Sequence, residues 1–158
     1  MQSPAKYIFD ICISMSLSSS TPILENISTG KHMICDLSNI KNMTRLESME
    51  SMCQLFDDIC AKYEFTVLGK IEHKFEPQGL SLIYMLSESH ISIHTFPEKR
   101  YLALDIYTCR NYEDDSIYIE IYKTIVKWFQ CDVSIPTIIS RGIPAVNTTD
   151  KNQCVNSY

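Results

Sequence analysis

The chain has 158 residues and a formal net charge of −5, with 45% hydrophobic and 21% charged residues. This length suits one domain with a hydrophobic core, and the composition is ordinary for a soluble globular protein. The negative charge argues against nucleic acid or an anionic membrane as the main partner, because neither offers an opposite charge to an acidic surface. No apolar run approaches the roughly 18 residues that a membrane helix requires. We therefore expect no nucleic-acid and no membrane partner.

Seven cysteines are scattered along the chain, and none of them form a CxxC pair. The apolar stretch Tyr7–Leu17 is short, is interrupted by Asp10 and is not followed by a clear cleavage site. It is therefore not expected to be a secretory signal. Scattered thiols without such a signal favour a reducing compartment, and the sequence predicts a cytoplasmic protein.

Both ends of the chain lack the periodic patterns of helices and strands. Residues 1–28 contain the run Ser18–Pro22 and are predicted to be a flexible N-terminal extension. Residues 145–158 are polar and are predicted to be a C-terminal tail. Between them, residues 29–144 are predicted to form one compact domain without internal repeats.

Within this domain, one long segment has apolar residues at spacings of three and four, which is typical of a helix with one buried face. Other segments are short and apolar or alternate between apolar and polar residues, as strands do. In chain order, the predicted elements are strand His32–Leu37, helix 43–63, strands Phe65–Phe75, Leu80–Leu86, Ile91–Phe96 and Tyr101–Thr108, helix 114–129 and strand Val133–Ile139.

The order of these elements is βαβββαβ. It predicts the α+β class, a two-layer sandwich with a mostly antiparallel sheet and two helices on one face. The other face of the sheet would need a cover, so we expect a second copy of the chain as partner.

The segment Ser87–Glu98 alternates as a strand does, but its polar positions are repeatedly serine and histidine. Three interpretations compete. The side chains could simply be hydrogen-bonded on a half-buried strand. His90, His94 and Cys109 could bind zinc, although a fourth ligand is not obvious. A serine could act as a nucleophile, with a histidine and a cysteine moving protons.

The register of the predicted hairpin favours the third interpretation, without a metal. Pro97–Arg100 is a natural turn, and an antiparallel hairpin centred there places Ser89 opposite Thr108 or Cys109. The same register places His94 opposite Ala103 or Leu104. His94 and Ser89 have opposite parity on an ideal strand, so bringing them together would require a bend or bulge near Ser89.

Several blocks of the sequence resemble the prokaryotic-type S-adenosylmethionine decarboxylase proenzymes, over roughly Gly30 to Gly142. The resemblance is carried by Gly30-Lys31-His32, by Phe75-Glu76-Pro77-Gln78-Gly79-Leu80-Ser81, by Glu88-Ser89-His90-Ile91-Ser92-Ile93-His94-Thr95-Phe96-Pro97-Glu98 and by Asp105-Ile106-Tyr107-Thr108-Cys109. The central block is long, ordered and chemically unusual, which makes it a specific signal.

The resemblance implies that the chain cleaves itself between Glu88 and Ser89, and that Ser89 becomes a pyruvoyl cofactor. The Ser89 hydroxyl would attack the Glu88 carbonyl, and His94 would remove the Ser89 α-proton from the resulting ester. Ser81 resembles the serine that assists this processing. The pyruvoyl group would then form a Schiff base with S-adenosylmethionine and accept the electrons released with carbon dioxide.

Two further residues are implied in turnover. Cys109 matches the proton donor to the product carbon, and a thiol suits that task because it is mostly protonated at neutral pH. Glu98 is implied, more weakly, to contact the ribose of the substrate. The product would be the aminopropyl donor for spermidine synthesis, made by a homodimer of cleaved protomers.

The sequence also departs from the family pattern beside the site. Phe96 stands where tryptophan is common, Lys99-Arg100 replaces an aromatic-glycine pair, and Arg110-Asn111 follows Cys109 where glycine is typical. Two alternatives therefore stay open. One is a pyruvoyl-dependent decarboxylase of another amino acid, such as ornithine or arginine, and the other is a non-catalytic regulatory partner subunit.

Overall fold

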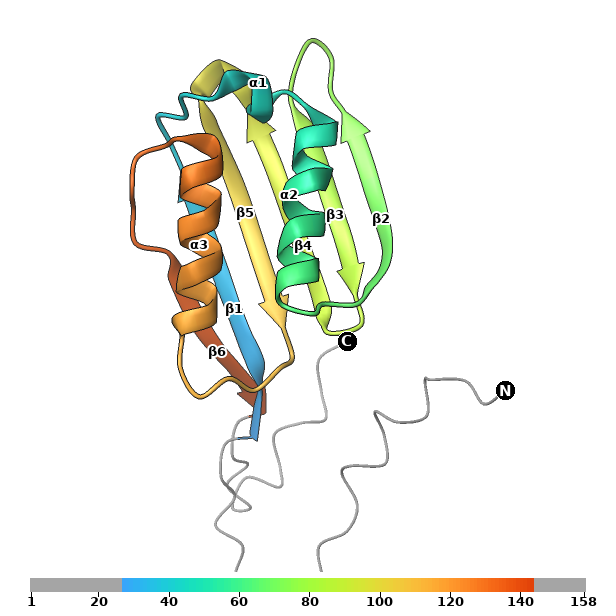
Figure 1. Ribbon diagram of the computed structural model, residues 1–158, viewed down its shortest axis with the longest axis vertical. Helices are drawn as coiled ribbons and strands as arrows, with labels where there is room; N and C mark the ends of the chain where they lie inside the picture. Colours follow the sequence, from blue (N-terminus) through green and yellow to red (C-terminus); the bar gives the residue numbers. More distant parts are fainter. Residues whose placement is uncertain (1–26, 144–158) are drawn as a thin grey trace, which may run out of the picture. The chain divides into compact units, whose positions relative to one another are not determined.

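The computed structural model describes residues 27–143, which form a single six-stranded sheet with helices on one side (Figure 1). The sheet order is β2-β3-β4-β5-β1-β6, and every neighbouring pair is antiparallel. In chain order, the elements are β1 (Ile27–Leu37), α1 (Met43–Leu46), α2 (Met49–Lys62), β2 (Val67–Lys74), β3 (Leu80–Leu86), β4 (Ser89–Phe96), the 3₁₀ turn η3 (Pro97–Lys99), β5 (Tyr101–Thr108), α3 (Ser116–Phe129) and β6 (Thr137–Ile143).

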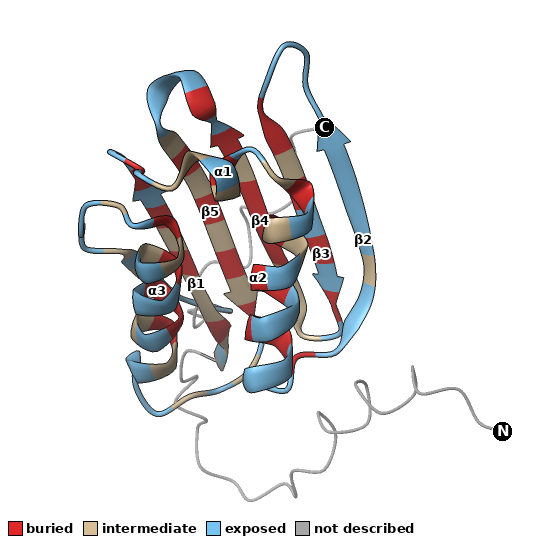
Figure 2. Ribbon diagram, turned by 45° about the horizontal axis from the view of Figure 1, so that its top comes forward, coloured by how far each residue is buried: buried red, intermediate tan, exposed pale blue. Residues whose placement is uncertain are grey.

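The core lies between the sheet and the helices α2 and α3, which cover the same face (Figures 1 and 2). Alternate residues of β3 and β5 are buried there, as expected for strands with one covered face. The predicted two-layer α+β sandwich is therefore confirmed, with α1 as an additional single turn. None of the helices within residues 27–143 is long and apolar enough to cross a membrane.

The predicted helix 43–63 is interrupted, so the prediction of one continuous helix is wrong. Ser48 has an extended backbone, with φ −106° and ψ 113°, and its side chain accepts a hydrogen bond from the Ser51 N–H. That is the geometry of an N-cap, which starts α2 as a new helix. Asn42 caps α1 in the same way by accepting from the Arg45 N–H. The apolar spacing continues across the break and therefore did not reveal it.

The last strand starts four residues later than predicted, at Thr137 instead of Val133. The Tyr122 hydroxyl donates to the Ser134 carbonyl and accepts from the Ser134 N–H at 2.7 Å, which holds this segment against α3. Pro136 has no N–H to offer to a strand partner. Val133 and Ile135 are 78% and 93% exposed, so their apolar character did not indicate a buried strand.

β1 begins at Ile27 and pairs with both β5 and β6. It is longer than the predicted strand His32–Leu37 and includes the last two residues of the predicted N-terminal extension. The remainder of that extension and the predicted tail 145–158 lie outside the described residues.

Gly30 allows β1 to pass directly against the end of β5. Its φ is +113°, and a Cβ built there would lie 2.0 Å from the Thr108 carbonyl oxygen and 2.6 Å from Cys109 Cα. The register of β1 against β6 also shifts between Ser28 and Gly30. Only glycine fits this backbone conformation and this close approach.

We expect Gly30→Ala to lower the free energy of unfolding by more than about 1 kcal/mol, because it adds both backbone strain and a steric clash. Denaturant unfolding of the purified variants would measure the loss. Gly69→Ala is the matched control, since nothing lies within 4 Å of a Cβ at Gly69. It should be neutral or stabilising by up to about 1 kcal/mol. Equal effects of the two substitutions would contradict the role given to Gly30.

Candidate active site

The predicted hairpin register is confirmed in the structure. β4 and β5 pair Ser89 with Thr108 and His94 with Ala103. β3 joins on the other side of β4 and pairs Ser81 with His94. Because directly opposed residues share a face of the sheet, this register decides which of the predicted site residues can meet.

Ser89 lies at the start of β4, directly after the two-residue turn Ser87-Glu88, and has a left-handed backbone with φ 138°. For a residue with a Cβ this conformation costs roughly 1–3 kcal/mol and persists only where the surroundings impose it. The Ser89 hydroxyl lies 3.3 Å from Nδ1 of His90. The backbone is therefore irregular at Ser89, through a left-handed residue and not through a bulge.

The carbonyl group that precedes Ser89 is held by β5. The backbone N–H of Cys109 donates to the Glu88 carbonyl oxygen at 2.8 Å. This is the carbonyl that the Ser89 hydroxyl would attack, and a hydrogen bond there draws electrons toward oxygen. A fixed N–H in this position is the element from which oxyanion holes are built.

The side chain of Glu88 is held as firmly as its carbonyl. One carboxylate oxygen accepts from Arg110 at 2.9 Å, and the other accepts from the Thr66 N–H at 3.1 Å. Burial would raise the pKa of Glu88, but the hydrogen bonds from Arg110 and from backbone N–H groups outweigh it and lower the pKa below the ordinary value. Glu88 is therefore an anion at neutral pH.

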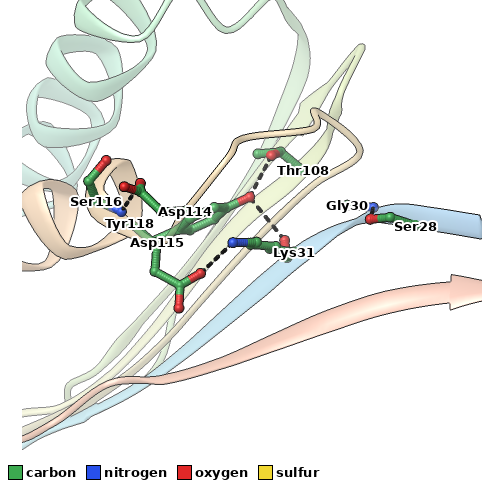
Figure 3. A network of polar contacts seen from close by, with 8 residues as sticks. All are labelled: Ser28, Gly30, Lys31, Thr108, Asp114, Asp115, Ser116 and Tyr118. Carbon is green, nitrogen blue, oxygen red and sulfur yellow. Dashed lines mark hydrogen bonds and ion pairs between the residues drawn. The ribbon is translucent and has the colours of Figure 1, made fainter.

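The end of β5 is also anchored from the helix layer (Figure 3). The Tyr118 hydroxyl on α3 lies 2.7 Å from the Thr108 hydroxyl and donates to the Lys31 carbonyl at 3.1 Å. Lys31 in turn forms an ion pair with Asp115, at 2.6 Å. Thr108 is fully buried, so this contact fixes the residue that pairs with Ser89.

The second group of predicted site residues lies at the opposite end of β4. The Ser81 hydroxyl is 2.6 Å from Nδ1 of His94. Both side chains line a cavity of about 210 Å³, together with Phe75, Phe96 and Glu98. Gln78 donates to the Glu98 carboxylate at 3.4 Å on the rim of the same cavity.

The structure therefore brings the predicted residues together as two pairs and not as one pocket. Ser89 and Cys109 share one end of the β4–β5 hairpin, as the register predicted. Ser81 and His94 share the cavity at the other end, to which Ser89 does not contribute. Five residues of extended chain separate Ser89 from His94, which is roughly 16 Å. Within one chain, His94 does not reach Ser89.

Between the two pairs, the face without helices carries a polar cluster. The rings of His32, His90 and Tyr107 contact one another, with centroids 5.8–6.1 Å apart. Asp105 lies beside them, 3.4 Å from Nε2 of His32. Burial, followed by the nearby His32, lowers the pKa of His90. The His90 ring next to Ser89 is therefore neutral at pH 7 and can accept a proton.

The zinc alternative has no geometric support. His90 and His94 share a face, but four residues of extended strand separate them by roughly 13 Å. Across residues 27–143, no group of three or more His, Cys, Asp or Glu side chains is placed to hold a metal ion.

The contacts that hold the Glu88–Ser89 turn leave no local pattern in the sequence. Arg110 and its partner Glu88 lie 22 residues apart in the chain. Thr66 contributes through its backbone N–H, which no side-chain pattern can reveal. The pattern of serine and histidine in Ser87–Glu98 predicts Ser89 and His94 as site residues, whereas Ser81 is implied by the family resemblance alone.

The chain is similar to several known proteins that carry the same name. The chain is 41% identical over 81 residues to the S-adenosylmethionine decarboxylase proenzyme of Clostridium botulinum strain Loch Maree, covering 51% of this chain and 69% of the relative. It is 33% identical over 115 residues to the proenzyme of the same name from Thermodesulfovibrio yellowstonii, covering 72% and 82%. The crystal structure of the adenosylmethionine decarboxylase from Aquifex aeolicus superposes with a TM-score of 0.65 at 25% identity, over 75% of this chain and 94% of that one.

The sequence model of one family spans nearly all of the sheet and both long helices, from residue 31 to residue 142. Since the curated relatives carry the same name and the solved structure has the same fold, the chain belongs to the S-adenosylmethionine decarboxylase family.

Proposed function

We propose that this adenosylmethionine decarboxylase is made as a proenzyme, cleaves itself between Glu88 and Ser89, and then decarboxylates S-adenosylmethionine with the pyruvoyl group derived from Ser89. One observation carries the proposal. The left-handed Ser89 directly follows a carbonyl that is held by the Cys109 N–H at 2.8 Å. A strained nucleophile beside a polarised carbonyl is the arrangement that self-cleavage requires.

The first step of the proposed cleavage uses Ser89, His90 and the Cys109 N–H. The Ser89 oxygen bonds to the Glu88 carbonyl carbon while neutral His90 accepts the hydroxyl proton, and the Cys109 N–H stabilises the oxyanion. The peptide C–N bond then breaks, the Ser89 nitrogen takes a proton, and an ester remains. Removal of the Ser89 α-proton expels the Glu88 carboxylate and leaves dehydroalanine. Water converts dehydroalanine into pyruvoyl with loss of ammonia, which gives chains 1–88 and 89–158.

The geometry of the uncleaved chain suits formation of a pyruvoyl group at position 89. Ser89 is the first residue of β4, and the carbonyl before it accepts a hydrogen bond from the Cys109 N–H. Pyruvoyl supplies an electrophilic ketone and a conjugated amide carbonyl that can accept the electrons of the breaking carboxylate bond. Cys109 directly follows the strand that pairs with Ser89 and is exposed, which supports a role of its thiol in delivering a proton to the product carbon.

The cavity at the other end of β4 suits the nucleoside part of the substrate. Phe75 and Phe96 offer aromatic surface to a purine ring, and Glu98 offers a carboxylate to ribose hydroxyl groups. His94, oriented by Ser81, has a ring nitrogen free to take the α-proton of position 89. These groups must act on the same substrate as Ser89, yet one chain holds them roughly 16 Å away.

We propose that a second copy of the chain closes this gap. The face of the sheet without helices carries Ser81, His94 and the His90 ring beside Ser89, and its apolar side chains Ile71, Met85 and Ile139 are 70%, 55% and 45% exposed. Such a surface is typical of a subunit interface. Two copies related by a two-fold axis would place the partner subunit's His94 beside Ser89, and each site would draw on both chains.

The pathway and the compartment belong to the same proposal. The decarboxylated product is an aminopropyl donor, so we place the enzyme in spermidine synthesis. The five cysteines of the described residues are all free thiols, in keeping with a reducing cytoplasm.

Freshly purified protein should resolve into two chains, and the fragment that begins at position 89 should carry a carbonyl and no free amine. Ser89→Ala should stay a single chain, because the nucleophile is gone. Intact-mass measurement under denaturing conditions tests both. Carbon dioxide release from labelled S-adenosylmethionine, with labelled ornithine and arginine as comparisons, tests the substrate. Wild-type protein that decarboxylates without being cleaved would refute the pyruvoyl group.

Cys109→Ser should be cleaved at a rate close to that of the wild type, because the contact to Glu88 comes from the backbone N–H. Its turnover should fall by roughly 10²–10⁴-fold, the usual loss on removing a general acid. His94→Ala should instead stall in processing and accumulate an ester that hydroxylamine cleaves. The role given to Cys109 is wrong if Cys109→Ser decarboxylates at the wild-type rate.

Co-expression of Ser89→Ala with His94→Ala tests whether the site is shared. In a mixed dimer, one site receives Ser89 from one chain and His94 from the other, so cleavage of the His94→Ala chain should return. Separate tags on the two chains identify which of them is cleaved. Ser89→Ala expressed with Ser89→Ala/His94→Ala is the control and should remain uncleaved. If His94 acts within its own chain, neither combination forms pyruvoyl.

A further inference from the structure

Arg110 connects three segments that meet at the cleavage turn. Its guanidinium donates to the Tyr63 carbonyl at 2.9 Å and to the Glu64 carbonyl, both just after the end of α2. It also donates to the Glu88 carboxylate at 2.9 Å, and it lies 5.2 Å from the centre of the Phe65 ring. Its own backbone directly follows Cys109. One side chain therefore joins α2, the β3–β4 turn and the end of β5.

Thr66 holds the Ser87-Glu88 turn from its other side. The Thr66 N–H donates to the second Glu88 carboxylate oxygen at 3.1 Å, and the Thr66 carbonyl accepts from the Ser87 N–H at 2.9 Å. Only 13% of the Glu88 side chain and 31% of the Arg110 side chain are exposed. With both carboxylate oxygens bonded, the Glu88 side chain has little freedom to rotate.

These contacts hold both partners of the hydrogen bond from the Cys109 N–H to the Glu88 carbonyl. Glu88 carries the carbonyl that accepts from Cys109, and its side chain is bonded to Arg110. Cys109 carries the N–H that donates, and it is the neighbour of Arg110 in the chain. A guanidinium suits this task, because its planar fork can serve a carboxylate and two carbonyls at once, which an ammonium group cannot do in one geometry.

We propose that Arg110 is a positioning residue for self-cleavage, which holds the Glu88 carbonyl on the Cys109 N–H while Ser89 attacks. This inference rests on the proposed function and deepens it.

The test follows the rate at which newly made chain is cleaved. Protein is synthesised in a short pulse, and the fraction of full-length chain is measured by denaturing gel and intact mass over time. Arg110→Gln should slow cleavage by roughly 10- to 100-fold, the range expected from losing hydrogen bonds to a charged group. Arg110→Lys should be intermediate, because it keeps the charge and loses the fork.

Arg45→Gln is the matched control for loss of structure. The Arg45 guanidinium donates to the Trp128 carbonyl at 2.8 Å and lies 3.9 Å from the centre of the Trp128 ring. It thus ties two elements together as Arg110 does, without touching the cleavage turn. Arg45→Gln should lower the melting temperature and leave the cleavage rate close to that of the wild type. Equal slowing by Arg45→Gln and Arg110→Gln would overturn the proposal, since cleavage would then follow general stability.

Chemical rescue gives a readout that a purely structural role would not move. Arg110→Ala leaves space at Glu88, and guanidinium chloride at non-denaturing concentration should restore much of the cleavage rate. Urea has a similar shape without the charge and should not restore it, nor should sodium chloride at the same ionic strength. Cleavage of Arg110→Ala at the wild-type rate without additives would overturn the proposal, as would equal rescue by urea.

These experiments distinguish a failure of the role proposed for Arg110 from a failure of self-cleavage itself. If wild-type chain is cleaved and Ser89→Ala is not, self-cleavage stands, and the Arg110 variants alone decide the inference. If wild-type chain is never cleaved, the proposed function fails and the inference fails with it.

Discussion

The hydrogen bond from the Cys109 N–H to the Glu88 carbonyl is the contact on which the candidate site depends. It lies one step beyond the Ser89–Thr108 pair, where the ladder between β4 and β5 ends. A ladder end would normally fray, because its outermost groups have no further partners. Here Gly30 lets β1 pass directly against this end, and Tyr118 holds Thr108 from the helix layer. The fold thus stiffens the point at which the proposed reaction begins.

In this site the strained residue and the contacts that hold it belong to different segments of the chain. Ser89 carries the unfavourable left-handed conformation, while the surrounding segments hold the turn on both sides. Strain can only be kept where neighbouring structure opposes its relaxation. In the proposed reaction the Glu88–Ser89 peptide is lost, so the conformation has to be maintained only in the precursor. That would explain why so many contacts converge on a turn of two residues.

The extended shape of β4 also keeps the predicted site residues at two separate places. One strand, β4, carries the proposed nucleophile Ser89 at its first residue and His94 near its last, and an extended chain keeps them roughly 16 Å apart. The helices cover one face of the sheet, and Ser81, His94 and the His90 ring beside Ser89 lie on the face left open. A second copy placed on that face would bury its apolar side chains and bring the two groups together. Assembly and catalysis would then rest on the same surface.

The sequence alone determined the features that follow from local periodicity and short turns. The turn after Phe96 set the register of β4 and β5, and with it the pairing of Ser89 with Thr108. Only the tertiary structure decided the break before α2, the start of β6 and the clamp of Glu88 by Arg110. These depend on a capping side chain, on a tyrosine that binds backbone groups, and on partners distant in the chain. Because such contacts arise when separate elements pack, neither spacing nor composition encodes them.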